Sequence, residues 1–150
     1  MRWQRLYNPF VVALLRSPLH GFMRGSTMLL TYAGRKSGKA YTRSVNYLRD
    51  SDTLLVVSSR EHIWWKNLRG GAPVAARVRG QDIRGVGEAY EGEDAVAEGG
   101  LLTVLRRVPA YRRYFGVELG ADGKSEDSEA LARVADSNTV VRIKDLIPER

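Results

Sequence analysis

The stretch 27-TMLLTYAGRKSGKAYTRSVNYLRDSDTLLVVS-58 decides the fold, because it alternates apolar segments with polar connections. Its segments 27–32, 41–49 and 53–58 are rich in β-branched and aromatic residues, which is the pattern of β-strands. The polar triplet Asp50-Ser51-Asp52 is a tight-turn signal. We therefore expect the second and third strands to form an antiparallel hairpin.

The rest of the chain adds strands and a few helices. Further strands are predicted at 74–79, 83–90 and 139–145, with a second hairpin turn at Gly80-Gln81-Asp82. Helices are predicted at 63–69, 94–107 and 127–135, and residues 116–126 are expected to form an exposed loop. The expected fold class is mainly β with flanking helices (α+β), arranged as a small antiparallel barrel.

Composition and charge limit the possible functions. The 150 residues carry 24 Lys and Arg against 17 Asp and Glu, a net charge of +7, and no Cys. Thiol chemistry and Cys-type metal sites are therefore excluded, and two His residues are too few for a zinc site, so no metal is expected. The length fits a single domain, 1–150, with a helical segment at 1–25 and the barrel with its helices at 26–150. The positive charge favours polyanionic partners.

The N-terminal segment has the apolar spacing of a helix. Asn8-Pro9 suits its start and Ser17-Pro18 its end. This basic, aromatic helix either packs against the barrel or contacts an anionic membrane surface. The apolar run 10–15 is too short to span a bilayer and no secretory signal is visible. We expect a cytoplasmic protein, with association to the inner face of the membrane as the alternative.

The connection between the first two strands, Gly34-Arg35-Lys36-Ser37-Gly38-Lys39, combines glycines with cations and a hydroxyl. Backbone N–H groups in such a bend can point the same way and, with Arg35, Lys36 and Ser37, form a phosphate cradle. Arg43 on the next strand is close enough to reach the same anion. The alternative is an ordinary solvated hairpin connection. A Walker A loop is excluded, because the spacing is one residue too short.

Two further segments suit a flat ligand. Residues 57–60 end a strand with hydroxyls and a cation, and a predicted helix with two tryptophans follows. The tryptophans either form an apolar wall for a planar ring or pack in the core, and we expect core packing for one of them. Tyr111 and Tyr114 would share one face of a helix, where their phenols either orient a substrate oxygen or form a packing ridge. No Ser-His-Asp arrangement is present, so triad chemistry is excluded.

Taken in order, these motifs resemble a known family. They are Gly-Arg-Lys-Ser-Gly, a following Arg, Ser-Ser-Arg at a strand end, Trp-Trp-x-Asn-Leu and Pro-x-Tyr-x-x-Tyr, over about residues 28–115. The combination resembles the deazaflavin (F420)-dependent nitroreductase family of actinobacteria, a branch of the flavin/deazaflavin oxidoreductases. The resemblance implies a split β-barrel, FMN-binding-like. It also implies hydride transfer from reduced coenzyme F420 to a small electron-poor acceptor, which would be a quinone, a nitroaromatic or an activated alkene.

The resemblance implies roles for single residues as well. The phosphate and acidic tail of F420 would be held by Arg35, Lys36, Ser37 and Arg43. The deazaflavin ring would lie along Val57, Ser58, Ser59 and Arg60, with Ile63, Trp64 and Asn67 completing that side. Tyr111 and Tyr114 would line the substrate side. Val108 stands where the nitroimidazole-activating member has a tyrosine, and residues 116–135 look like an insertion, so nitroimidazole activity is not implied.

We therefore expect a deazaflavin-dependent reductase that binds F420 rather than FMN and takes a small-molecule substrate, as a monomer or a homodimer. One alternative is a split-barrel binding protein for FMN, heme or a fatty acid. Another is a basic nucleic-acid-binding barrel. Nucleic acid is not the expected partner, because no strand alternates aromatic and basic residues as a stacking platform would.

Overall fold

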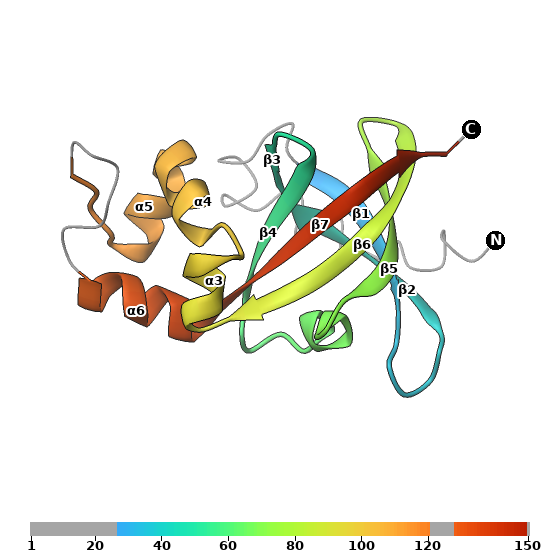
Figure 1. Ribbon diagram of the computed structural model, residues 1–150, viewed down its shortest axis with the longest axis horizontal. Coiled ribbons are helices and arrows are strands. Elements are labelled where there is room, and N and C mark those ends of the chain that lie inside the picture. Colours follow the sequence, from blue (N-terminus) through green and yellow to red (C-terminus); the bar gives the residue numbers. More distant parts are fainter. Residues whose placement is uncertain (1–26, 121–127, 150) are drawn as a thin grey trace.

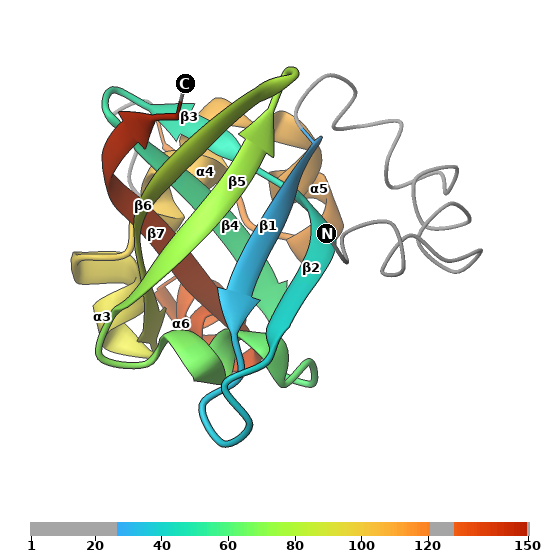
Figure 2. The same cartoon turned by 90° about the vertical axis from the view of Figure 1, so that its right-hand side faces the viewer.

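A computed structural model describes residues 27–120 and 128–149 and contains one antiparallel sheet, in the order β2-β1-β5-β6-β7-β4-β3. The strands are β1 (Thr27–Ala33), β2 (Ala40–Asn46), β3 (Leu48–Asp50), β4 (Thr53–Ser59), β5 (Ala72–Val78), β6 (Gln81–Glu91) and β7 (Asn138–Pro148). Figure 1 and Figure 2 show that the sheet curls on itself and stays open between its edge strands, β2 and β3. The expected split β-barrel is confirmed.

Residues 40–50 supply both edge strands of the sheet. β2 pairs with β1, whereas β3 pairs with β4 at the opposite edge. The single strand predicted over 41–49 is therefore wrong. The chain crosses from one edge to the other at Tyr47, whose side chain is buried in the barrel core.

Both predicted hairpins are present, and the position of one turn needs correction. Asp50 pairs with Thr53, as expected. In the second hairpin Gln81 already pairs with Val78, so the turn lies at Arg79-Gly80 rather than at Gly80-Gln81-Asp82. Arg79 and Gly80 have φ values of 51° and 80°. Positive φ at both central residues is the geometry of a type I′ turn, which matches the twist of the paired strands.

Helices pack on one side of the barrel (Figure 1). The α-helices of the described residues are α3 (Glu93–Ala97), α4 (Leu101–Arg107), α5 (Pro109–Phe115) and α6 (Ser128–Ser137); a 3-10 helix, η2 (Trp64–Leu68), follows β4. The single helix predicted over 94–107 is wrong, because Gly100 separates α3 from α4 with a φ of 91°. This left-handed conformation is one that glycine adopts readily and that is not helical, so the helix is interrupted here. A Cβ atom on Gly100 would also lie 2.9 Å from the Leu55 side chain.

β4 and β7 bury both of their faces. Alternate residues of a strand point to opposite faces of the sheet. Accordingly Val56 and Val141 belong to the barrel core, while their neighbours Val57 and Val140 pack with the helices. The end of β4 therefore lies between the barrel and the helices, and the candidate site begins there.

The predicted N-terminal helix and its membrane contact lie outside the described residues. In the part of the chain that the structure describes, no helix is long and apolar enough to cross a bilayer.

Candidate functional site

The basic loop between β1 and β2 is a closed bend. The Gly34 N–H donates to the Lys39 carbonyl at 2.8 Å, and the Gly38 N–H donates to the Gly34 carbonyl at 2.9 Å. Gly38 has a φ of 71°, and a Cβ on Gly34 would lie 2.9 Å from the Tyr41 ring. The backbone conformation therefore favours glycine at position 38, and a side chain at position 34 would have to displace Tyr41.

This loop is docked on η2. The Arg35 N–H donates to Asn67 Oδ1 at 2.9 Å, and the Arg35 guanidinium donates to the Lys66 carbonyl at 3.0 Å. The Asn67 side chain in turn donates to the Trp64 carbonyl at 2.9 Å. Arg35 and Asn67, which are 32 residues apart in the sequence, are therefore brought together. Asn67 positions the loop as well as bordering it.

The loop presents positive charge that the described residues do not neutralise. Arg35, Lys36 and Lys39 are exposed, as is Ser37. Within residues 27–120 and 128–149, no acidic side chain forms an ion pair with these cations. A fixed bend with several unpaired cations suits a polyanionic ligand, because the ligand would supply the missing counter-charge.

Arg43 lies beside the loop on a cluster of aromatic rings. Its guanidinium carbon is 5.4 Å from the centroid of the Trp64 ring, which is a cation–π contact. The Tyr32 ring lies 5.9 Å from Tyr41 and 5.8 Å from Trp64. Burial raises the pKa of Tyr32, and the nearby charge of Arg43 opposes this shift only in part. Tyr32 therefore stays protonated at neutral pH.

Sequence reasoning missed Tyr32 and Tyr41 as part of this cluster. They are cross-strand partners at the base of the basic loop. Their symmetric placement about the loop was a usable signal, since residues equidistant from a hairpin connection face each other.

Both tryptophans of η2 are in the core, so the expectation that only one packs there is wrong. Trp64 is 4% exposed and Trp65 is 1% exposed. Trp64 Nε1 donates to Ser58 Oγ at 3.0 Å, which engages the predicted ring-side hydroxyl of Ser58. Trp64 thus supports the candidate site from within the core.

At the end of β4 and just after it, some residues are accessible to solvent and others are held by hydrogen bonds. Ser59 is half-buried, and Ile63 is 72% exposed. Arg60 is held by α6: its backbone N–H donates to the Ser137 carbonyl at 3.0 Å, and its guanidinium donates to the Ala135 carbonyl at 3.2 Å. Arg60 consequently ties the end of β4 to the C-terminal end of α6.

A cavity of about 340 Å³ opens beside Ser59. It is lined by Ser59, Tyr114, Phe115, Ala130, Arg133, Val134, Ser137 and Asn138. The volume lies within the range of small-molecule pockets. The cavity therefore joins one predicted ring-side residue to one predicted substrate-side residue.

The two predicted substrate-side tyrosines have different surroundings. Tyr114 is 65% exposed and borders the cavity. Tyr111 is half-buried and stacks on Phe115 at a centroid distance of 5.8 Å, and burial raises its pKa. The Phe115 ring also contacts Tyr114, at 5.1 Å. Phe115 thus connects Tyr111 to the cavity that Tyr114 lines.

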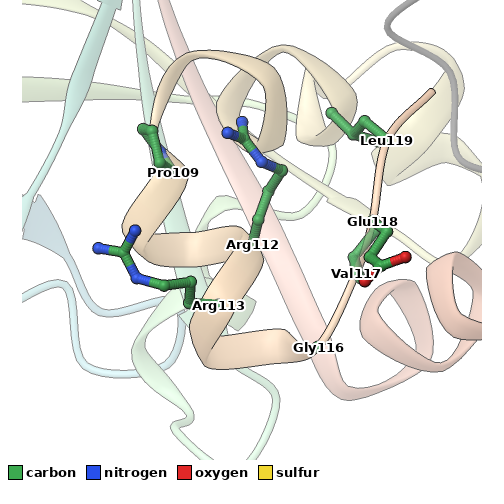
Figure 3. A pocket seen from close by; sticks show the side chains of 7 residues that line it. All are labelled: Pro109, Arg112, Arg113, Gly116, Val117, Glu118 and Leu119. Atoms are coloured by element: carbon green, nitrogen blue, oxygen red, sulfur yellow. The ribbon is translucent and has the colours of Figure 1, made fainter. Parts of the chain in front are cut away.

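A second hollow, of about 470 Å³, lies between α5 and the segment 116–119 that follows it (Figure 3). Arg112, one of its lining residues, donates to the carbonyls of Leu105 and Arg106 at 2.6 and 2.9 Å. These bonds hold α5 against the end of α4. The hollow contains none of the residues predicted for the site.

Several solved structures are similar to this chain, and those with a TM-score of 0.50 or more support the fold. A protein of unknown function from Agrobacterium tumefaciens has a TM-score of 0.51 at 15% identity, over 90% of this chain and 58% of that one. A domain-swapped dimer has a TM-score of 0.50 at 15% identity, over 91% and 100% of the two chains. A pyridoxamine 5'-phosphate oxidase-related, FMN binding protein from Nostoc punctiforme aligns at 10% identity, over 92% and 81%, with a TM-score of 0.49.

The family is shown by the sequence itself. No curated protein matches the chain. The model of one family, described as F420H(2)-dependent quinone reductase, matches residues 14–116, which is more than half of the chain and includes the basic loop, η2 and α5. This chain therefore belongs to the F420H2-dependent quinone reductase family.

Proposed function

We propose that this protein is an F420H2-dependent reductase whose basic loop, 34–39, holds the phosphate and acidic tail of the cofactor. The observation that carries the proposal is the loop's set of exposed cations without acidic partners in the described part of the chain, fixed in place by Asn67. Arg35, Lys36 and Ser37 would contact the anion directly. Arg43, held on the Trp64 ring, would complete the binding site.

The deazaflavin ring would lie along residues 57–60, with Ile63 and Asn67 on the same side and Trp64 packed in the core next to them. Ile63 supports this placement, because a 72% exposed Ile next to a binding site offers apolar area to a ring. When bound, F420H2 supplies a hydride, that is two electrons and one proton, and a quinone becomes a hydroquinone after taking up one further proton. The contribution of the protein is orientation and exclusion of water.

The acceptor would enter the cavity beside Ser59. The cavity suits a small, flat, electron-poor molecule, since Phe115 and Val134 give it apolar walls and Tyr114 gives it a phenol. A quinone is the acceptor named by the family, and nitroaromatics and activated alkenes share its flat, electron-poor character.

Titrating the purified protein with oxidised F420 and with FMN, side by side, tests the cofactor. We expect F420 to bind at least tenfold more tightly, because its oligoglutamate tail adds charge that FMN lacks and the loop can pair with it. Fluorescence quenching of the deazaflavin measures the dissociation constant. Equal affinity for both cofactors, or tighter binding of FMN, would overturn the assignment.

Tyr114→Phe is expected to lower kcat/KM for a quinone about tenfold and to leave F420 affinity unchanged. The phenol borders the cavity, so its loss removes one hydrogen bond to the acceptor oxygen. Tyr111→Phe is the matched control, with a smaller effect, because this tyrosine packs behind Phe115. Steady-state kinetics of both variants measure kcat/KM for the quinone, and F420 titration measures their cofactor affinity. A larger effect from Tyr111→Phe would contradict the placement of the acceptor.

A further inference from the structure

The cavity beside Ser59 has walls of two different origins. Ser59, Tyr114 and Phe115 lie within residues 14–116, which match the family model. Arg133, Ser137 and Asn138 lie beyond that range, on α6 and at the start of β7. With Ala130 and Val134, five of the eight residues that line the cavity therefore belong to a segment that the family match does not cover, which we call the α6 wall. The acceptor preference set by the α6 wall belongs to this chain.

The α6 wall carries the only charged side chain among the described residues that line the cavity. Arg133 is a cation, and no Asp or Glu of residues 27–120 or 128–149 lines the cavity. Arg133 is exposed, and no acidic side chain of residues 27–120 or 128–149 forms an ion pair with it. Phe115, Ala130 and Val134 add apolar surface beside this cation. An apolar floor with one guanidinium at its side fits a flat ring that carries an anionic substituent.

The α6 wall is held in a fixed position relative to the end of β4. Arg60 donates hydrogen bonds to the carbonyls of Ala135 and Ser137, at the C-terminal end of α6. Asn138 Nδ2 donates to the Val134 carbonyl at 3.0 Å and is itself buried. Arg133 is therefore presented from an anchored helix, which lowers the entropy lost when it pairs with a ligand.

We propose that Arg133 makes this enzyme prefer acceptors that bear an acidic group, such as a carboxylate or sulfonate, on the electron-poor ring. This inference rests on the proposed function, because it concerns the acceptor of the same hydride transfer. The guanidinium would pair with two oxygens of the acidic group while the ring lies against Phe115. Arg133 would act as a specificity-determining residue and would take no part in the transfer itself.

Two quinones with the same ring system test the proposal: 1,4-naphthoquinone-2-sulfonate, which is anionic, and 2-methyl-1,4-naphthoquinone, which is neutral. Their binding is measured on protein saturated with oxidised F420, where no turnover occurs, and F420 affinity is measured in parallel. For Arg133→Gln we expect the preference for the sulfonate over the neutral quinone to fall about five- to tenfold, with F420 affinity unchanged. Arg133→Lys keeps the charge but cannot pair with two oxygens at once, so it should keep only part of the preference, more than Arg133→Gln does.

Arg113→Gln is the matched control, because Arg113 is an exposed arginine that lines the other hollow (Figure 3). It should leave the preference unchanged. If Arg133→Gln binds F420 normally and has the same preference as the wild type, the role of Arg133 is overturned and the proposed function stands. Failure of the wild type to bind F420 would instead overturn the proposed function. An equal loss of preference in Arg113→Gln would indicate a general charge effect and also contradict the proposal.

Discussion

Replacing Arg35 and Lys36 together by Ala is expected to weaken F420 binding about a hundredfold or more. A hydrogen bond to a charged group contributes about 1.5–3 kcal/mol, so losing two costs about 3 kcal/mol at the lower limit. Each 1.4 kcal/mol corresponds to about a tenfold change in the dissociation constant. Both side chains are exposed, and within the described residues neither has an acidic partner that would become unpaired. Titration of F420 fluorescence measures the change.

The matched control removes the same two charges elsewhere. The control is the double variant Arg77→Ala/Arg79→Ala. Both residues belong to the β5–β6 hairpin, which lies at the other end of the barrel from the basic loop (Figure 2). Arg77 pairs only with Asp82, at 3.4 Å and largely exposed, so its loss changes stability little. F420 affinity should change less than threefold in this control. Equal weakening in both double variants would show a general charge effect, and an unchanged dissociation constant for Arg35→Ala/Lys36→Ala would remove the loop from the binding site.

The barrel was predictable because its strands carry local signals. The β-branched and aromatic residues over 27–32 and the apolar run over 53–58 each indicate a strand without reference to the rest of the chain. The break at Gly99-Gly100 also had a local signal, since two adjacent glycines weaken a helix. The close approach of the Leu55 side chain to Gly100 is a tertiary contact, and no pattern in the sequence reveals it.

The site was predictable only where its parts are local. The basic loop is contiguous, so the hypothesis of an anion site can be drawn from its composition, with a solvated hairpin connection as the alternative. The docking of Arg35 on Asn67 depends on how η2 folds back against the β1–β2 loop. The α6 wall depends on the pairing of β4 with β7, which brings Asn138 opposite Ser59. Such contacts join residues far apart in the sequence, so composition and periodicity carry no information about them.

Trp64→Ala is expected to lower the free energy of unfolding by about 3–5 kcal/mol, as large aromatic truncations in a core do. The side chain is 4% exposed, stacks under Arg43 and donates to Ser58. A domain of this kind has about 5–15 kcal/mol of stability in total, so the variant should unfold at much lower denaturant concentration. Ile63→Ala, the adjacent residue in the chain, is the control and should change stability by less than about 0.5 kcal/mol, because its side chain is 72% exposed.

The variant Trp64→Phe distinguishes two possible roles of Trp64: supporting the site by packing beneath it, or contacting the cofactor directly. Phe retains most of the apolar contact and the ring beneath Arg43, but it loses the hydrogen bond to Ser58 Oγ, which contributes about 1 kcal/mol. If Trp64 acts through packing, F420 affinity in this variant stays within about threefold of wild type, because Arg43 keeps an aromatic surface to rest on. A loss of F420 binding as large as that of Arg35→Ala/Lys36→Ala, at nearly normal stability, would mean that the indole itself contacts the cofactor. Urea unfolding and F420 titration of the same samples distinguish the two roles. Only loss of a direct contact would weaken F420 binding strongly while the free energy of unfolding stays nearly normal.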